Sequence, residues 1–374
     1  MRIIFFIFIS IFCLLSSNSS VFAQESTQVL PIYKQEFYKA KVNAILEDGH
    51  KDMGEILVPY QKLELELSGD IADKKIVLDT LGRSQFSDDK KIKKGDILIL
   101  YRTSIDGETT DFQISDKYRS GEVIYLAIAF VALVLLVGRL RGFGSIIGLC
   151  ITFLVIFFYI VPQILKGKDP VVESIVGSSI IIFTSIYLSH GFSKKTTIAI
   201  ISTVITLILT GLLAAFSVDF TNLSGIGNDL AQGFNLNPTL GEINLKGLLL
   251  GGMIIGSLGV LDDVTTTQSA AIFELIKANP TLKFTQLLEK GFNIGKDHIS
   301  SVVNTLVLAY TGASFPVLLF IVLNPTNQPL WVMLNSEPIM EEIVRTLVGS
   351  MGLVLSVPIT TVLASWFVTR NVKK

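Results

Sequence analysis

Apolar runs of about twenty residues follow one another along the chain from residue 121 almost to its end. A run of this length is what an α-helix needs to cross the hydrocarbon core of a bilayer. We therefore predict a polytopic α-helical membrane protein with about seven transmembrane helices. The expected ranges are 121–138, 144–165, 171–189, 196–218, 246–264, 298–323 and 340–368.

A different pattern occupies residues 24–118. The stretches KLELELSGD, KKIVLDT and KKGDILILYR alternate polar and apolar residues and are bounded by Gly, Asp and Asn, which is typical of β-strands. Gly95 and Asp96 indicate a tight turn before a buried strand at residues 97–101. The spacing favours a small β-barrel-like domain, OB-like or of a related kind.

The first residues have the pattern of a secretory signal peptide. Arg2 is followed by an apolar stretch at residues 3–15 that is short for a span, and Val21-Phe22-Ala23 is an acceptable cleavage site. An uncleaved anchor is the alternative, and either would place the next residues outside the cytoplasm. The predicted organisation is a signal peptide at 1–23, an extracytoplasmic β-rich domain at 24–118 and a transmembrane domain at 119–374.

Charge predicts the orientation independently of hydropathy, because loops rich in Lys and Arg tend to stay in the cytoplasm. With the β domain outside, the outer side of the membrane offers only Lys166 and Lys168, with Lys246 at a helix edge. We therefore expect a multi-pass protein of the cytoplasmic (inner) membrane with a cytoplasmic C-terminus. The predicted cytoplasmic side holds Arg139, Arg141, Lys194, Lys195, Lys277, Lys283, Lys290, Lys296, Arg370, Lys373 and Lys374.

Composition agrees with a membrane protein: 50% of the 374 residues are hydrophobic, 17% are charged, and the mean hydropathy is +0.58. The net charge of −1, without a basic stripe, argues against nucleic acid as a partner. Cys13 and Cys150 cannot build a disulfide framework or a thiolate metal site. No Walker-type phosphate loop is present, and we expect no cofactor.

The most informative motif is GSLGVLDDVTTTQSA at residues 256–270, where Asp262 and Asp263 follow a glycine-rich apolar run. Asp262 lies about 24 Å along a helix that begins near Lys246. Ionisable residues at such a depth are usually functional, although an acid at the wet end of a helix would also fit. Helical patterning continues over residues 269–278, and residues 284–293 form an expected short amphipathic helix at the inner membrane surface.

Hydroxyls accompany both acids on a continuous helix. Thr266 and Ser269 follow Asp262 at i+4 and i+7, and Thr267 follows Asp263 at i+4. Such oxygens can ligate a hard cation or hold an acid by hydrogen bonds. Asn304 in the sixth span is the expected cross-helix partner of Asp263, with a helix-joining hydrogen bond as the alternative. The metal, if any, is not determined by this pattern.

Two further groups complete the candidate residues. Gly252, Gly256 and Gly259 form a small-residue face that favours close helix packing. On the outer side, Glu341 and Glu342 precede Arg345 at i+4 and i+3, which allows ion pairs and predicts a clamp or a simple interfacial salt bridge.

Three long stretches resemble the YibE/F family of bacterial multi-spanning membrane proteins: GSLGVLDDVTTTQSA, FNIGKDHISSVVNTLVLAYTGASFP and NSEPIMEEIVRTLVGSMGLVLSVP. With the domain before the first span, the similarity covers nearly all of the mature chain. The family's usual single Asp followed by Val matches Asp263 and Val264, whereas Asp262 departs from that pattern. The resemblance implies the architecture and no particular activity.

The sequence leaves several functions open. A transporter or permease for a small ion or solute is favoured, with Asp263 in an intramembrane polar site. A non-catalytic scaffold or sensor whose outer domain binds an envelope partner is the alternative. A magnesium-dependent lipid-phosphate enzyme fits less well, because the chain has no second acidic cluster in a long cytoplasmic loop. The expected partners are the lipid bilayer, a small ion or solute, and a second copy or an envelope protein.

Overall fold

We analysed the protein as a computed structural model. The structure describes residues 33–52, 57–68, 74–80, 91–105, 108–109, 111–227, 233, 243–324 and 327–372. These residues fall into two compact units, one up to Leu133 and one from Val134 onward. The predicted signal peptide at 1–23 lies outside the described residues.

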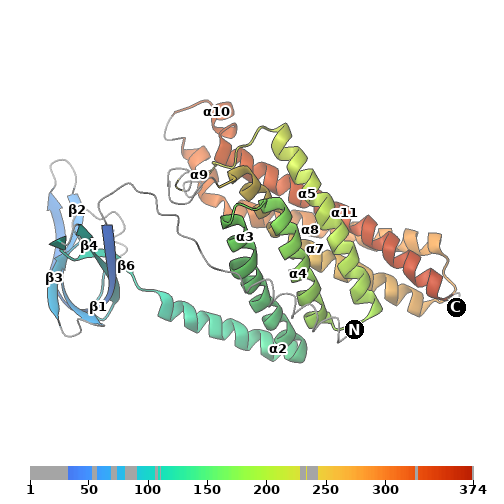
Figure 1. The fold of residues 1–374 in the computed structure, drawn as a ribbon, viewed down its shortest axis with the longest axis horizontal. Coiled ribbons are helices and arrows are strands. Elements are labelled where there is room, and N and C mark those ends of the chain that lie inside the picture. Colours follow the sequence, from blue (N-terminus) through green and yellow to red (C-terminus); the bar gives the residue numbers. More distant parts are fainter. Residues whose placement is uncertain are drawn as a thin grey trace. The chain divides into compact units, whose positions relative to one another are not determined.

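The first unit contains an antiparallel sheet (Figure 1). Its order is β3-β2-β1-β4-β5, and β6 also pairs with β4. No pairing of β3 with β5 or β6 is found among the described strands, so closure into a barrel stays a prediction. The strands are β1 (Tyr33–Asp52), β2 (Leu57–Ser68), β3 (Lys75–Asp79), β4 (Ile97–Ile105), β5 (Glu108–Thr109) and β6 (Gln113–Lys117).

The alternation seen in the sequence accounts for the core of this sheet. In β2, Leu63, Leu65 and Leu67 are buried, while Glu64 and Glu66 lie on the other face. β1 is bent by irregularities in its pairing with β2, which let one long strand pair on both sides. The small antiparallel sheet that the pattern predicts is therefore confirmed.

The predicted turn before β4 is also present. Gly95 has a φ of 93°, which glycine adopts without steric cost, and its N–H donates to the Val42 carbonyl at 2.8 Å. The Asp96 carboxylate accepts hydrogen bonds from Lys117 Nζ at 2.7 Å and from the Lys93 N–H at 2.9 Å. Burial of the Asp96 carboxyl opposes ionisation, but these hydrogen bonds outweigh it and hold its pKa below the usual range.

The second unit is helical, and local signals in the sequence explain where two of its helices begin. Asp169 accepts hydrogen bonds from the N–H groups of Val171 and Val172, with Pro170 in the first position of α4. Ser193 accepts from the Thr196 N–H at the start of α5. The helices are α2 (Ser120–Val155), the π-helical segment η2 (Ile156–Ile160), α3 (Val161–Leu165), α4 (Pro170–His190), α5 (Lys194–Phe220), α7 (Leu245–Ala278), α8 (Phe284–Ala313), α9 (Phe315–Leu323), α10 (Leu330–Leu334) and α11 (Glu337–Val372).

Five helical segments among the described residues are long and apolar enough to cross a bilayer. α8 and α9 would add a sixth span if this pair, bent by 67°, is one span. The prediction of about seven counts residues 121–138 and 144–165 separately, whereas the five segments include both ranges in Ser120–Leu165, a 46-residue segment that is interrupted at Arg139. The apolar helices thus fit a membrane-embedded protein, and the number of its spans stays a prediction.

The long first segment is interrupted at Arg139, which has a φ of 49° and a ψ of −129°. Just after it, Gly142 lies so close to the Val134 carbonyl that a Cβ atom would overlap it. Gly144 makes a similar approach to the Leu188 carbonyl of α4. The chain therefore turns sharply at Arg139 and packs its following part on α4 through glycines.

α7 is the central helix of this unit, because it packs against α4, α5, α8 and α11 (Figure 1). Ile254, Leu258 and Leu261 of α7 share one buried cluster with Ile182 and Ile186 of α4. The arrangement surrounds most of α7 with other helices, so a polar residue on it lies either in a helix interface or on the remaining open face.

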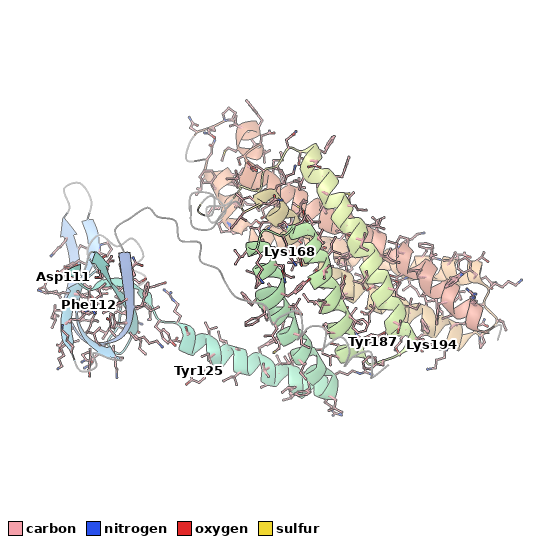
Figure 2. The ribbon with its side chains drawn as sticks, viewed as in Figure 1. Asp111, Phe112, Tyr125, Lys168, Tyr187 and Lys194 are labelled. Atoms are coloured by element: carbon pink, nitrogen blue, oxygen red, sulfur yellow. The ribbon has the colours of Figure 1, made fainter. Side chains whose placement is uncertain are left out.

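Charged residues mark the two ends of the bundle. Lys168 lies at one end of α4, and Tyr187 lies at the other end near Lys194 of α5 (Figure 2). On α7, Lys246 pairs with Asp219 at one end, and Ser269 donates to the Lys195 carbonyl at the other. Lys246 and Ser269 are about 34 Å apart along the helix axis, close to the thickness of a hydrocarbon core.

Candidate functional site

The two adjacent carboxylates lie in the interior of a helix. The sequence pattern predicts a span that ends at residue 264, but α7 continues without a break to Ala278. Counted back from Ser269, Asp263 and Asp262 are about 9 and 10 Å deeper along the axis. Both acids therefore lie between the Lys246 end and the Lys195 end of the bundle, well inside the level of Lys195.

One face of the motif joins α7 to three other helices. The hydroxyls of Thr265 and Thr203 in α5 share a hydrogen bond of 2.6 Å, and Ser269 donates to the Lys195 carbonyl at 2.8 Å. The Gln268 amide donates to the Gly291 carbonyl of α8 at 2.8 Å and to Thr361 Oγ1 of α11 at 2.7 Å. This polar face is structural, because it is buried and occupied by helix contacts.

The opposite face of the motif is uncovered. Gly252, Gly256, Gly259, Asp263 and Thr267 are all exposed, and their spacing of three or four residues places them on one stripe of α7, which we call the glycine–aspartate stripe. A Cβ atom at Gly252 or Gly259 would meet nothing within 4 Å, and at Gly256 it would meet only the Tyr310 hydroxyl at 3.5 Å. Among the residues that the structure describes, the close packing expected of these glycines is not made.

The acids differ in their surroundings. Asp262 is half-buried and Asp263 is exposed on the stripe. Thr266 donates to the backbone carbonyls of Asp262 and Asp263, at 2.9 and 3.1 Å, and not to their carboxylates. In the part of the chain that the structure describes, neither carboxylate has an ion-pair partner. Asp263, with Thr267 one turn along the stripe, is thus an uncovered carboxyl position.

Asn304 does not join this site within one chain. It is exposed on α8, whereas α8 packs on α7 and α11 through Gly295 and Leu306, on the other side of the helix. Its role as a ligand stays a prediction. Across the described ranges, no group of three His, Cys, Asp or Glu side chains could hold a metal ion.

The acidic cluster at the Lys246 end is partly assembled as expected. The Glu342 carboxylate pairs with the Arg345 guanidinium at 2.9 Å, which is the predicted i+3 pair, and it accepts a hydrogen bond from Ser314 Oγ at 3.1 Å. Glu341, only 4% exposed, instead accepts the Gly227 N–H at 2.9 Å. Within this cluster, Glu342 and Arg345 therefore form an ion pair, whereas Glu341 holds the backbone at Gly227 in the segment before α7, a contact that we call the clamp.

A residue that the sequence reasoning missed extends this clamp. One carboxylate oxygen of Glu337 accepts from the N–H and hydroxyl of Ser224, at 2.6 and 2.5 Å, and from the Gly225 N–H at 3.1 Å. The available signal was its place in the first turn of α11, where an acid is common for reasons of helix capping. Its partners are separated from it by more than one hundred residues, so no local pattern identifies them.

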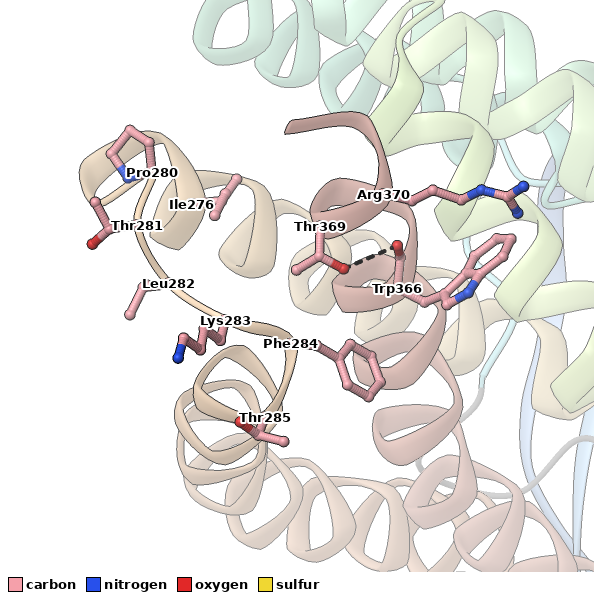
Figure 3. Close-up of a pocket in the computed structure, with 10 residues that line it drawn as sticks. All are labelled: Ile276, Pro280, Thr281, Leu282, Lys283, Phe284, Thr285, Trp366, Thr369 and Arg370. Atoms are coloured by element: carbon pink, nitrogen blue, oxygen red, sulfur yellow. Dashed lines mark hydrogen bonds between the residues drawn. The ribbon is translucent and has the colours of Figure 1, made fainter. Parts of the chain in front are cut away.

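A hollow lies at the Lys195 end of the bundle, outside the predicted site. It measures about 820 Å³ and lies between the end of α7, the start of α8 and the end of α11 (Figure 3). The Arg370 guanidinium lies over the Trp366 ring, 5.2 Å from its centre. None of the predicted site residues lines this hollow, which is formed by Ile276, Pro280, Thr281, Leu282, Lys283, Phe284, Thr285, Trp366, Thr369 and Arg370.

Comparison with known proteins decides the family. A sequence model described as YibE/F-like protein matches residues 126–370, which is more than half of the chain. The chain belongs to the YibE/F-like family. The match confirms the resemblance over the helices, and it leaves the β sheet of this YibE/F-like protein outside the matched range. No curated protein and no solved structure matches the chain.

Proposed function

We propose that this YibE/F-like protein is a permease for a small cation or a small cationic solute, with Asp263 as the central binding group. The observation that carries the proposal is the glycine–aspartate stripe, which leaves a carboxylate uncovered at bilayer depth. Thr267 would add a hydroxyl ligand on the same stripe. Asp262, half-buried beside it, would lie next to the site without touching the solute.

The energetics favour a site that holds water or a cation. A carboxylate in the middle of a helix costs about 2.5–3.5 kcal/mol on membrane-insertion scales, even when lipid and water adjust around it. Neither acid has a compensating cation among the described residues of the chain. A mobile cation or a water-filled space beside α7 removes this cost, whereas lipid tails do not.

The stripe also suggests a path. From Asp263 the exposed glycines continue toward the Lys246 end for about 16 Å to Gly252. Without side chains they leave room along the helix, and the Tyr310 hydroxyl at Gly256 offers a polar contact on the way. A solute would move along this side of α7 between the two ends of the bundle.

We also propose the orientation that the charges favour. Lys195 and Arg370 belong to the end of the bundle where the hollow and the Lys-rich connections lie, and we place this end in the cytoplasm of a bacterial inner membrane. The β sheet would then be extracytoplasmic, as part of a permease whose outer unit contacts envelope components.

Transport by reconstituted protein tests the proposal. Proteoliposomes are loaded with pH- and cation-sensitive dyes, and flux is measured for the wild type, for Asp263→Asn and for Glu274→Gln. Glu274 is a matched control, because it lies on the same helix beyond the Lys195 level and pairs with Lys277 at 3.7 Å. We expect Asp263→Asn to lower cation flux by roughly tenfold or more and Glu274→Gln to leave it unchanged. Equal flux in wild type and Asp263→Asn would refute the role of Asp263.

A further inference from the structure

A second uncovered polar face runs along α8. Its positions follow each other at alternating intervals of three and four residues, which is the heptad spacing of paired helices, and every one of them is exposed. We call it the heptad face. It consists of Lys290, Asn293, Asp297, Ser300, Asn304, Val307 and Thr311.

Most of this face lies at bilayer depth. Gly295 packs against Gln268 and Val357, and Gln268 is next to Ser269 at the Lys195 level of the bundle. Residues of α8 that follow Gly295 are therefore within the membrane region, up to Tyr310, whose hydroxyl lies beside Gly256 and Gly349. Lipid tails offer no hydrogen-bonding partner to Asp297 or Asn304, whereas the Ser300 hydroxyl donates to the Lys296 carbonyl of its own helix at 3.0 Å.

The packing of the chain turns this face outward. The buried positions of α8 are Leu287, Gly291, Gly295 and Leu306, and they contact α7 and α11. The first predicted span of the same chain is almost entirely apolar between residues 123 and 137, so it cannot satisfy a row of polar side chains. Within lipid, the polar side chains of the heptad face therefore need a partner helix with polar groups at the same spacing.

We propose that a second copy of this chain covers the heptad face, with the two α8 helices parallel and related by a two-fold axis along the membrane normal. Asn304 and Thr311 can each pair with the same residue of the other copy, because a hydroxyl or amide both donates and accepts. Val307 supplies an apolar contact between the polar layers.

The charges on α8 are complementary in this pairing. In a parallel heptad pair, a core residue at an a position, here Lys290 or Asp297, faces the same residue of the other helix and also lies beside the residue just before it. Asp297 then meets Lys296 of the second copy, and Lys290 meets Glu289 of the second copy. None of these four side chains has an ion pair within the described ranges of its own chain, so all four are available for contacts between copies.

Cysteine cross-linking in membranes tests the pairing. In a background with Cys13→Ala and Cys150→Ala, single substitutions Ser300→Cys, Asn304→Cys and Val307→Cys are oxidised with copper phenanthroline. The matched control is Thr305→Cys, which is exposed on α8 at the same depth but one residue off the heptad face. We expect disulfide-linked dimers at 300, 304 and 307 and little at 305.

A second measurement separates the pairing from chance collisions. Adding Asn304→Leu to Ser300→Cys should lower the dimer yield by about three- to fivefold. The substitution removes one interhelical hydrogen bond and makes this part of the heptad face apolar, so that lipid tails can cover it. Equal cross-linking at 300 and 305, no dimer at any of the three positions, or adducts with a different protein would each overturn the proposal. The pairing does not depend on transport, so loss of flux in Asp263→Asn leaves it unaffected.

Discussion

Gln268 offers the sharpest test of how the bundle is held together. Its side chain is 1% exposed, and its amide nitrogen donates both to the Gly291 carbonyl and to Thr361 Oγ1, which joins α7 to α8 and α11. Gln268→Leu keeps nearly the same volume and removes both hydrogen bonds. An interhelical hydrogen bond in a membrane protein contributes about 0.6 kcal/mol on average and up to about 1.7 kcal/mol.

The expected loss in the free energy of unfolding depends on which hydrogen bonds the two acceptors, Thr361 Oγ1 and the Gly291 carbonyl, keep without Gln268. Thr361 still donates to the Val357 carbonyl at 2.7 Å, and the Gly291 carbonyl lies inside a regular helix, so neither is stripped of every partner. We expect Gln268→Leu to lower the free energy of unfolding by about 1–2 kcal/mol. The assay is equilibrium unfolding of the purified protein in mixed detergent micelles with increasing SDS.

Thr266→Val is the matched control for this prediction. Thr266 lies on the same helix, but its hydroxyl bonds only to the carbonyls of Asp262 and Asp263 in its own helix. Its substitution should change the free energy of unfolding by less than about 0.5 kcal/mol. The reasoning is refuted if Gln268→Leu is as stable as the wild type, or if both variants lose the same amount.

The remaining predictions concern other parts of the chain. Asp96→Asn should destabilise the β sheet by about 1 kcal/mol near pH 7. Because the pKa of Asp96 is lowered, its contribution is complete above the pKa of the unfolded chain and is lost as pH falls through the folded value. Hydrogen exchange of β4 amides at several pH values measures this, and an equal effect at all pH values would contradict it. Glu337→Gln weakens three hydrogen bonds to Ser224 and Gly225, so proteolysis near residues 221–227 should be about tenfold faster, and an unchanged rate would argue against the clamp. Gly144→Ala should cost about 1–3 kcal/mol in thermal unfolding because its Cβ overlaps the Leu188 carbonyl, whereas Gly138→Ala, with open space around it, should not.

The sequence predicts the elements of this protein well where one physical rule dominates. Alternation in KLELELS places Leu63 and Leu65 in the sheet core, and long apolar runs identify the helices. It fails on the length of α7, because hydropathy falls where the helix passes the level of Ser269 although the backbone continues to Ala278. The amphipathic stretch at 284–293 is likewise the first part of α8 and not a separate helix.

The candidate site shows a different limit. The motif VTTTQS is polar on two sides of α7, and periodicity does not tell which side meets another helix. Gln268 and Thr265 are taken by α8, α11 and α5, whereas Asp263 and Thr267 are left open. Which side of α7 is covered depends on contacts between residues distant in the sequence, and the periodicity of one sequence does not reveal these contacts.

Solvent access to the glycine–aspartate stripe tests the central claim most directly. In the background without native cysteines, Asp263→Cys and Gly256→Cys are treated in membranes with a charged, membrane-impermeant thiol reagent. Leu212→Cys is the control, because Leu212 is 64% exposed on α5 but apolar and suited to face lipid. A permease path along α7 predicts modification at positions 263 and 256 and none at 212. If Asp263→Cys is as inert as Leu212→Cys, the stripe faces lipid and the account is wrong.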